Sequence, residues 1–155
     1  MVSQRILVLD RRAFTAAELL VVLAIISIVA ITAMPSLITY WRAATAKAGA
    51  QELAAGLNRG RHLAIARNQS VCVEVVGIQY RYRIGGCGGT IWTGPGATAT
   101  GFFTLANNVT IATNANPVFD YLGAAAPAAT FTVTNPQGGT PRSVAVSGSG
   151  RVRVQ

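Results

Sequence analysis

An uncharged hydrophobic segment near the start of the chain constrains the fold more than any other feature. Leu19–Tyr40 contains no Asp, Glu, Lys or Arg, and it is long enough to cross a bilayer core, which needs about 20 residues. Because lipid offers the backbone no hydrogen-bond partners, a helix is the expected structure there. Glu18 lies directly before the segment, where a carboxylate costs roughly 2.5–3.5 kcal/mol to keep in lipid. The sequence therefore predicts a membrane span at 19–40 beside an acid that needs a partner.

The helical pattern continues beyond the hydrophobic segment. Residues 43–67 are rich in Ala, Leu, Gln, Glu, Lys and Arg, which favour helices, and Asn68 is a typical helix stop. Pro35 is expected to kink the helix or to open it locally. Small and apolar residues recur at three- and four-residue steps and predict one buried stripe: Ala46, Ala50, Leu53, Leu57, Gly60 and Ala64. One helix is therefore expected over residues 14–68.

After the helix, residues 69–155 follow a pattern with period two. Valines, isoleucines and tyrosines alternate with polar residues, and turns rich in Gly and Asn separate the alternating runs. About seven short antiparallel strands are predicted, with a loop at 94–100, irregular backbone at 124–129, and Tyr80 and Tyr82 in the core. The fold class is therefore α+β, a long N-terminal helix packed on a C-terminal antiparallel β domain.

The last hairpin can be predicted residue by residue. A three-residue loop that ends at a left-handed Gly150 places valines opposite valines, whereas a two- or four-residue loop would pair valines with arginines. Burial favours the three-residue loop, because the register decides which residues share the apolar face. Arg151 and Arg153 then emerge together on the opposite face. The expected valine pairs are Val146 with Val152 and Val144 with Val154.

Charge and cysteine content limit the possible functions. A net charge of +8 and a pI near 10.8 favour nucleic acid, anionic lipid or an acidic protein face as partners, with an ordinary solvated surface as the alternative. Cys72 and Cys87 either form a disulfide, as expected outside the cytoplasm, or stay two buried thiols. His62 is the only histidine, is expected to face solvent, and belongs to no Cys/His spacing typical of a metal site. An enzyme is therefore the least favoured class, and no cofactor is predicted.

The segment Ala13–Ile26, AFTAAELLVVLAII, resembles the type III signal of type IV pilins and type II secretion pseudopilins. In that family a prepilin peptidase removes a leader on the cytoplasmic side and methylates the new amino terminus. The resemblance implies a leader at 1–13 and cleavage between Ala13 and Phe14. The family usually has Gly where this chain has Ala13.

Glu18 and Pro35 also match the family's pattern, which implies a role for both in assembly. Cleavage creates an ammonium at Phe14, and in a helical filament Glu18 of one subunit can approach that ammonium on its neighbour. A buried carboxylate needs such a partner, because removing one side of a buried pair costs about 3–5 kcal/mol. The alternative is that Glu18 only favours the helix N-terminus, where acids are stabilising.

Two further segments, 53–68 and 150–154, resemble the GspH/FimT group of minor pilins. The resemblance implies a subunit of a type II secretion pseudopilus or type IV pilus that supports protein secretion. Its partners would be other pilins or pseudopilins, the prepilin peptidase and the bacterial inner membrane. The chain would cross that membrane once, with the C-terminal domain periplasmic or extracellular. A plain signal-anchored protein with an unrelated β domain is the competing interpretation.

A second function follows from the end of the chain. FimT-like members resemble DNA receptors of natural transformation, with Gly-Arg-x-Arg as the binding element, which Gly150, Arg151 and Arg153 match. Guanidiniums two residues apart on one strand stand ~6.6 Å apart and suit the phosphates of double-stranded DNA without reading bases. Arg142 is expected to add to this patch. The alternative is an ordinary solvated strand face.

Overall fold

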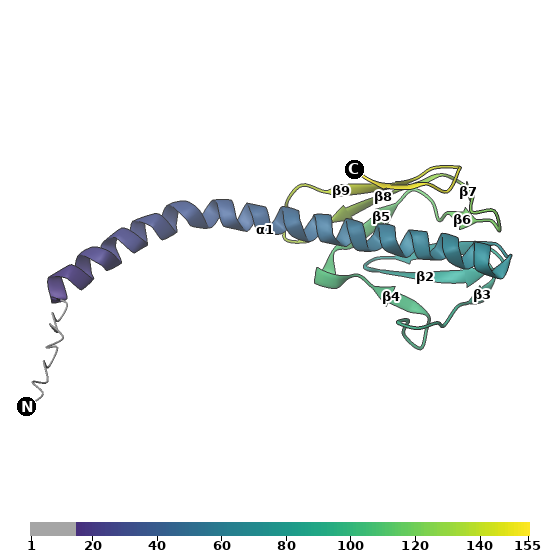
Figure 1. Cartoon of the computed structure of the whole chain (residues 1–155), viewed down its shortest axis with the longest axis horizontal. Coiled ribbons are helices and arrows are strands. Elements are labelled where there is room, and N and C mark those ends of the chain that lie inside the picture. The colour runs from purple at the N-terminus through teal and green to yellow at the C-terminus, as the bar shows by residue number, and fades with distance from the viewer. Residues whose placement is uncertain (1–14) are drawn as a thin grey trace, which may run out of the picture. The chain divides into compact units, whose positions relative to one another are not determined.

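A computed structural model describes residues 15–155 and contains two compact units, of which the first ends at Ile38 and the second is Thr39–Gln155. One helix, α1 (Ala16–Arg67), begins in the first unit and ends in the second. The strands described all lie in the second unit, beside the last turns of α1 (Figure 1). The predicted leader at 1–13, its last residue Ala13, and Phe14 lie outside the described residues.

The predicted helix is present, and its bounds agree with the expected 14–68 to within two residues. The backbone stays helical on both sides of Pro35, and a bend there stays a prediction. Asn68 has a φ of 51°, the left-handed conformation that commonly follows a helix end. The Gln69 N–H donates to the Ala64 carbonyl at 3.2 Å, which satisfies one of the last helical carbonyls.

The strands form two antiparallel sheets. In the first sheet the hydrogen-bonded strands follow the order β3, β2, β1, β6, β7, and β4 also pairs with β2. In the second sheet the order is β10, β9, β8, β5. The first sheet consists of β1 (Val71–Val76), β2 (Gln79–Ile84), β3 (Thr90–Ile91), β4 (Phe102–Thr104), β6 (Val118–Phe119) and β7 (Ala125–Ala126). The second consists of β5 (Thr110–Thr113), β8 (Ala129–Thr134), β9 (Arg142–Val146) and β10 (Val152–Val154). A single 3-10 turn, η1 (Ala106–Asn108), precedes β5 in the described chain.

The strand pattern of the sequence missed four short strands, β3, β4, β6 and β7. β3, β6 and β7 have two residues each, which is too short to show alternation, and β4 begins with two adjacent phenylalanines, Phe102 and Phe103. The prediction of irregular backbone at 124–129 is wrong, because this stretch contains β7 and the first residue of β8. Alanine supplies no contrast between an apolar and a polar face, so the run gave no signal. The loop at 94–100 is confirmed.

The core lies between the second half of α1 and the two sheets. All six residues of the predicted stripe are buried, and Gly49 and Gly56 are buried beside them. Tyr80 and Tyr82 are core residues as expected, with 6% and 0% of their surface exposed. Burying one such ring contributes about 1.5–3 kcal/mol.

Glycines in α1 let the rings approach the helix backbone. A Cβ built on Gly56 would lie 2.6 Å from the Tyr80 ring, and the Tyr82 hydroxyl donates to the Gly56 carbonyl at 2.8 Å. A glycine inside a helix costs about 1 kcal/mol relative to alanine. The close contact with two buried aromatic rings offsets that cost and fixes the helix against the first sheet.

Candidate functional site

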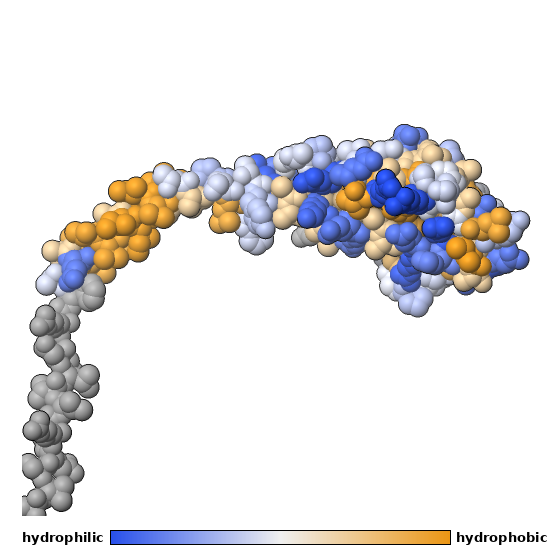
Figure 2. Space-filling model, turned by 45° about the horizontal axis from the view of Figure 1, so that its top comes forward, coloured by the Kyte–Doolittle hydropathy of each residue, from blue (hydrophilic) through white to orange (hydrophobic). Residues whose placement is uncertain are grey.

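The first unit, as far as it is described, is a helix whose large apolar side chains are exposed. Leu20, Ile28 and Ile31 keep 67%, 65% and 73% of their surface accessible, and Figure 2 shows this stretch as a nearly unbroken hydrophobic surface. Its length and composition suffice to cross a membrane. A continuous apolar surface of this size marks a site that lipid or other protein covers.

Hydroxyl groups in this stretch donate hydrogen bonds to backbone carbonyls of the same helix. The Ser27 hydroxyl donates to the Leu23 carbonyl at 2.7 Å, and the Thr32 hydroxyl donates to the Val29 carbonyl at 3.0 Å. An unsatisfied polar group in hydrocarbon costs several kcal/mol, so these bonds remove an obstacle to burial in lipid.

Glu18 lies in the first turn of α1. The residue that caps the helix is Thr15, whose hydroxyl oxygen accepts a hydrogen bond from the Glu18 N–H at 3.2 Å. Among residues 15–155, no donor or cation contacts the Glu18 carboxylate. The described chain therefore leaves this acid free to take a partner.

At the other end of the chain, the predicted register of the last hairpin is confirmed. Val152 pairs with Val146, the Ser147 N–H donates to the Arg151 carbonyl at 3.0 Å, and Gly150 has a φ of 72°. The three-residue loop places Arg151 and Arg153 on the same outer face, and both are exposed. Within residues 15–155 neither guanidinium forms an ion pair or a hydrogen bond.

The inner face of this hairpin is only partly buried along β10. Val152 is half-buried and Val154 is 41% exposed, because β10 is the edge strand of its sheet.

Arg142 does not join the two C-terminal arginines. It pairs with the buried Val133 of β8, and directly paired residues point to the same face of a sheet. Arg142 therefore lies on the inner face, opposite Arg151 and Arg153. Its Nε is buried and lacks a hydrogen-bond partner within residues 15–155. It lines a surface pocket with Lys47, Gln51, Val154 and Gln155.

Gly150 has a steric role as well as a conformational one. A Cβ built on it would lie 1.8 Å from the Gly123 carbonyl oxygen, so the loop after β9 packs directly on the turn between β6 and β7. The Gly148 carbonyl also accepts from the Ala125 N–H at 3.0 Å. The glycine of the Gly-Arg-x-Arg pattern therefore lets the hairpin that carries the two arginines pack against the turn at Gly123.

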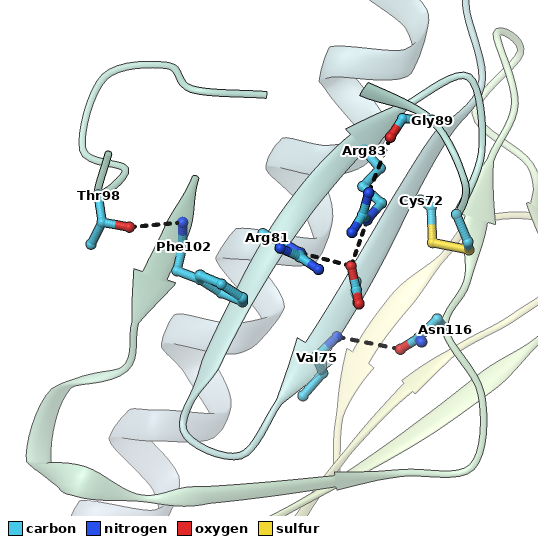
Figure 3. A network of polar contacts seen from close by, with 10 residues as sticks. Cys72, Val75, Arg81, Arg83, Gly89, Thr98, Phe102 and Asn116 are labelled. Carbon is cyan, nitrogen blue, oxygen red and sulfur yellow. Dashed lines mark hydrogen bonds and ion pairs between the residues drawn. A yellow bond between two sulfur atoms is a disulfide. The ribbon is translucent and has the colours of Figure 1, made fainter. Parts of the chain in front are cut away.

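The second arginine pair, Arg81 and Arg83, is bound within the first sheet. Both Nε atoms donate to Glu74 Oε2, at 2.7 and 2.6 Å (Figure 3). These two bonds lower the pKa of Glu74 from 4.5 to about 2. Sequence reasoning missed the contact, although the two-residue connection that Gly77 permits places Glu74 directly opposite Arg81. This pair is therefore partly neutralised and unlike the free pair at the C-terminus.

A disulfide bond joins Cys72 in β1 to Cys87 in the loop after β2 (Figure 3). His62 is exposed, as predicted. Within residues 15–155 no group of three His, Cys, Asp or Glu side chains could hold a metal ion.

Comparisons with known proteins agree with this architecture. A family model described as type II transport protein GspH matches residues 49–150. The type IV minor pilin FimU of Pseudomonas aeruginosa shares 18% identity over 70% of this chain and 91% of its own, with a TM-score of 0.51. The minor pseudopilin EpsH from the Type 2 Secretion System of Vibrio cholerae shares 15% identity over 71% of this chain and 95% of its own, with a TM-score of 0.54. No curated protein sequence matches the chain.

At these identities the two structures show a common fold. The family match extends from the stripe of α1 to the loop before β10, and so covers most of the second unit. This is a family of structural pilin subunits, which associate with other pilins in a filament. The chain therefore belongs to the GspH family and has the fold of the minor pilins and minor pseudopilins.

Proposed function

We propose that this chain is a minor pilin or pseudopilin subunit that prepilin peptidase cleaves between Ala13 and Phe14, and that it assembles into a pseudopilus or pilus that supports protein secretion. One observation carries the proposal. The first half of α1 exposes apolar side chains beside an acid, Glu18, that has no partner among residues 15–155. Such a helix needs lipid before assembly and other helices after it.

Processing would supply the missing partner. The new ammonium at Phe14 is the counterion for Glu18 of a neighbouring subunit. An ion pair in a low-dielectric environment forms only when both charges are placed close together, so the pair would select correctly placed subunits. Pro35 lies within the same exposed stretch and belongs to the same assembly segment.

The proposed location is the bacterial inner membrane, crossed once, with the second unit in the periplasm or outside the cell. The disulfide between Cys72 and Cys87 is compatible with that side, because disulfides persist in oxidising compartments. The basic surface of the second unit would then face other subunits and not the cytoplasm.

The test is N-terminal sequencing of the membrane form in cells that contain the peptidase. The mature chain is expected to begin at Phe14, with a methylated amino group. Ala13→Gly is the matched control and is expected to be cleaved at the same bond, whereas Ala13→Lys blocks cleavage. A wild-type chain that still begins at Met1 would contradict the proposal.

A second candidate function is capture of double-stranded DNA during uptake, and it is favoured by one observation. Arg151 and Arg153 are exposed, share a face and lack partners within residues 15–155. Purified full-length protein in detergent should bind duplex DNA with an affinity that falls steeply as salt rises. The double variant Arg151→Ala, Arg153→Ala should lose this binding. Arg142→Ala is the control, because its side chain lies on the opposite face; equal loss in the control would contradict the assignment.

A further inference from the structure

The turn between β6 and β7 exposes two large apolar side chains. Tyr121 and Leu122 keep 54% and 72% of their surface accessible, and they occupy the two central positions of a turn that runs from Asp120 to Gly123. Those positions are usually filled by Gly, Pro, Asn, Asp or Ser. Two large apolar residues in their place favour a contact over solvent exposure.

Hydrogen bonds hold this turn in one conformation. The Gly123 N–H donates to the Asp120 carbonyl at 3.0 Å, and Asp120 Oδ1 accepts from the N–H groups of Leu122 and Ala124 at 2.9 and 2.8 Å. Gly123 itself is buried with a φ of 85°. The two side chains are therefore preorganised, which lowers the entropy that a partner must overcome on binding.

The end of α1 extends the apolar surface. Ile65 is 44% exposed, and a Cβ built on Gly123 would lie 3.0 Å from its Cδ1. Arg61 lies one turn earlier, with its Nε 2.7 Å from the same Cβ position and 3.3 Å from one built on Gly150. Arg151 follows Gly150 in the chain. We call this surface the apical patch: Ile65, Tyr121 and Leu122, flanked by Arg61 and Arg151.

The charges indicate which kind of partner fits. The second unit has only three acids, and each already has a partner: Glu52 accepts from the Ala106 N–H at 3.0 Å, Glu74 binds two arginines, and Asp120 binds its own turn. A second copy would therefore offer basic groups to a basic rim. The complementary partner is a different protein that presents an apolar contact flanked by carboxylates.

We propose that the apical patch docks a different pilin-type subunit of the same fibre, through an apolar contact flanked by acidic side chains. The inference rests on the proposed function, because it assumes that the chain enters a fibre. An aromatic and aliphatic centre with arginines at its edge is the composition of protein interfaces, in which charged residues are depleted from the centre. Leu122 and Tyr121 are the expected anchors.

The partner can be identified by photocrosslinking in cells that assemble the fibre. A photoreactive phenylalanine derivative replaces Leu122 of the full-length chain, and in a control it replaces Val76, which is 53% exposed at the hairpin end of β1. Position 122 is expected to give an adduct with another pilin-type subunit, and position 76 is not. An adduct only with a second copy, an adduct with DNA, or no adduct in cells where the wild-type chain enters fibres would overturn the proposal.

Substitutions separate this proposal from the proposed function. Tyr121→Ser with Leu122→Ser should reduce incorporation into fibres about tenfold, as for loss of interface anchors, while the chain is still cleaved at Phe14. Val76→Ser should have no effect, and Arg151→Glu should lower the adduct yield at position 122. If the wild-type chain neither matures nor enters fibres, the proposed function fails. If it does both and the double serine variant is incorporated equally well, only the docking proposal fails.

Discussion

The two halves of α1 differ in whether the described chain covers their apolar side chains. In residues 16–38 the large apolar side chains are exposed around the helix, and Leu20 and Ile31 show it most clearly. In residues 39–67 the buried positions form one stripe, and the sheets of the second unit cover it. The first half therefore needs an environment that the described chain does not supply, whereas the second half is completed within the chain.

This difference separates folding from assembly. The second half uses small residues, such as Gly56, to bring rings and helix together, and its contacts decide whether the domain is stable. The first half has no such contacts within residues 15–155, and under the proposed function its one acid, Glu18, pairs with a neighbouring subunit. Substitutions in the first half should change fibre formation without changing the stability of the domain, whereas substitutions in the buried stripe of the second half should lower that stability.

The largest effect is expected at Glu18. Glu18→Ala should reduce incorporation into fibres by about a hundredfold or more, because loss of one side of a buried ion pair costs about 3–5 kcal/mol. Membrane insertion and the unfolding temperature of the second unit should not change. Incorporation is measured in purified fibres, and insertion by membrane fractionation.

Thr15→Ala is the matched control for Glu18→Ala. It removes the cap that the structure shows, at a cost of about 1 kcal/mol, and leaves the carboxylate in place. If both variants assemble equally well, Glu18 only supports the helix N-terminus and the pairing with a neighbour's Phe14 ammonium is wrong.

The next effect lies in the second unit, at the disulfide. Cys87→Ser leaves the buried Cys72 in place and opens a loop with a sequence separation of 15. The free energy of unfolding should fall by about 3 kcal/mol, because the unfolded chain regains the freedom of the open loop. Denaturant unfolding of the full-length protein in detergent measures the loss. Wild-type protein treated with a reductant should unfold like the variant, and a difference between them would show that the serine acts by itself.

Sequence patterns predicted the parts of this fold whose burial is periodic. The stripe of α1 and the register of the last hairpin both follow from which residues share an apolar face, and both are confirmed. The face of Arg142 also follows from this alternation, because Arg142 stands two residues before Val144 and four before Val146 in β9. The prediction that it joins Arg151 and Arg153 was wrong because it did not apply that rule. To predict the contact between Glu74 and its two arginines, the exact length of the turn at Gly77 would have been needed. To predict the apical patch, one would have needed to know which turns lie side by side in the folded domain.

The third effect tests the close contact in the core of the second unit. Gly56→Ala should lower the free energy of unfolding by about 2 kcal/mol, since the clash with the Tyr80 ring outweighs the gain of about 1 kcal/mol that alanine brings to a helix. Ala55→Leu is the control, because Ala55 is exposed on the same turn and a larger side chain there meets solvent. A more stable Gly56→Ala variant would show that the sheet can move away from the helix.

The smallest effect is the loss of stability in acid, which should depend on Glu74 in the first sheet and not on Glu18 in the first half of α1. The arginines beside Glu74 lower its pKa to about 2 in the folded chain. Its contribution to the free energy of unfolding is therefore complete above the unfolded pKa of 4.5 and is lost as the pH falls from 4.5 toward 2. Because the group is partly exposed, the loss should be about 1 kcal/mol. Glu74→Gln should remove this part of the acid dependence, and Glu18→Gln should leave it unchanged. Unfolding of both variants at pH 5 and pH 3 gives the comparison, and an equal change in the two would show that the charge of Glu18 also stabilises the second unit.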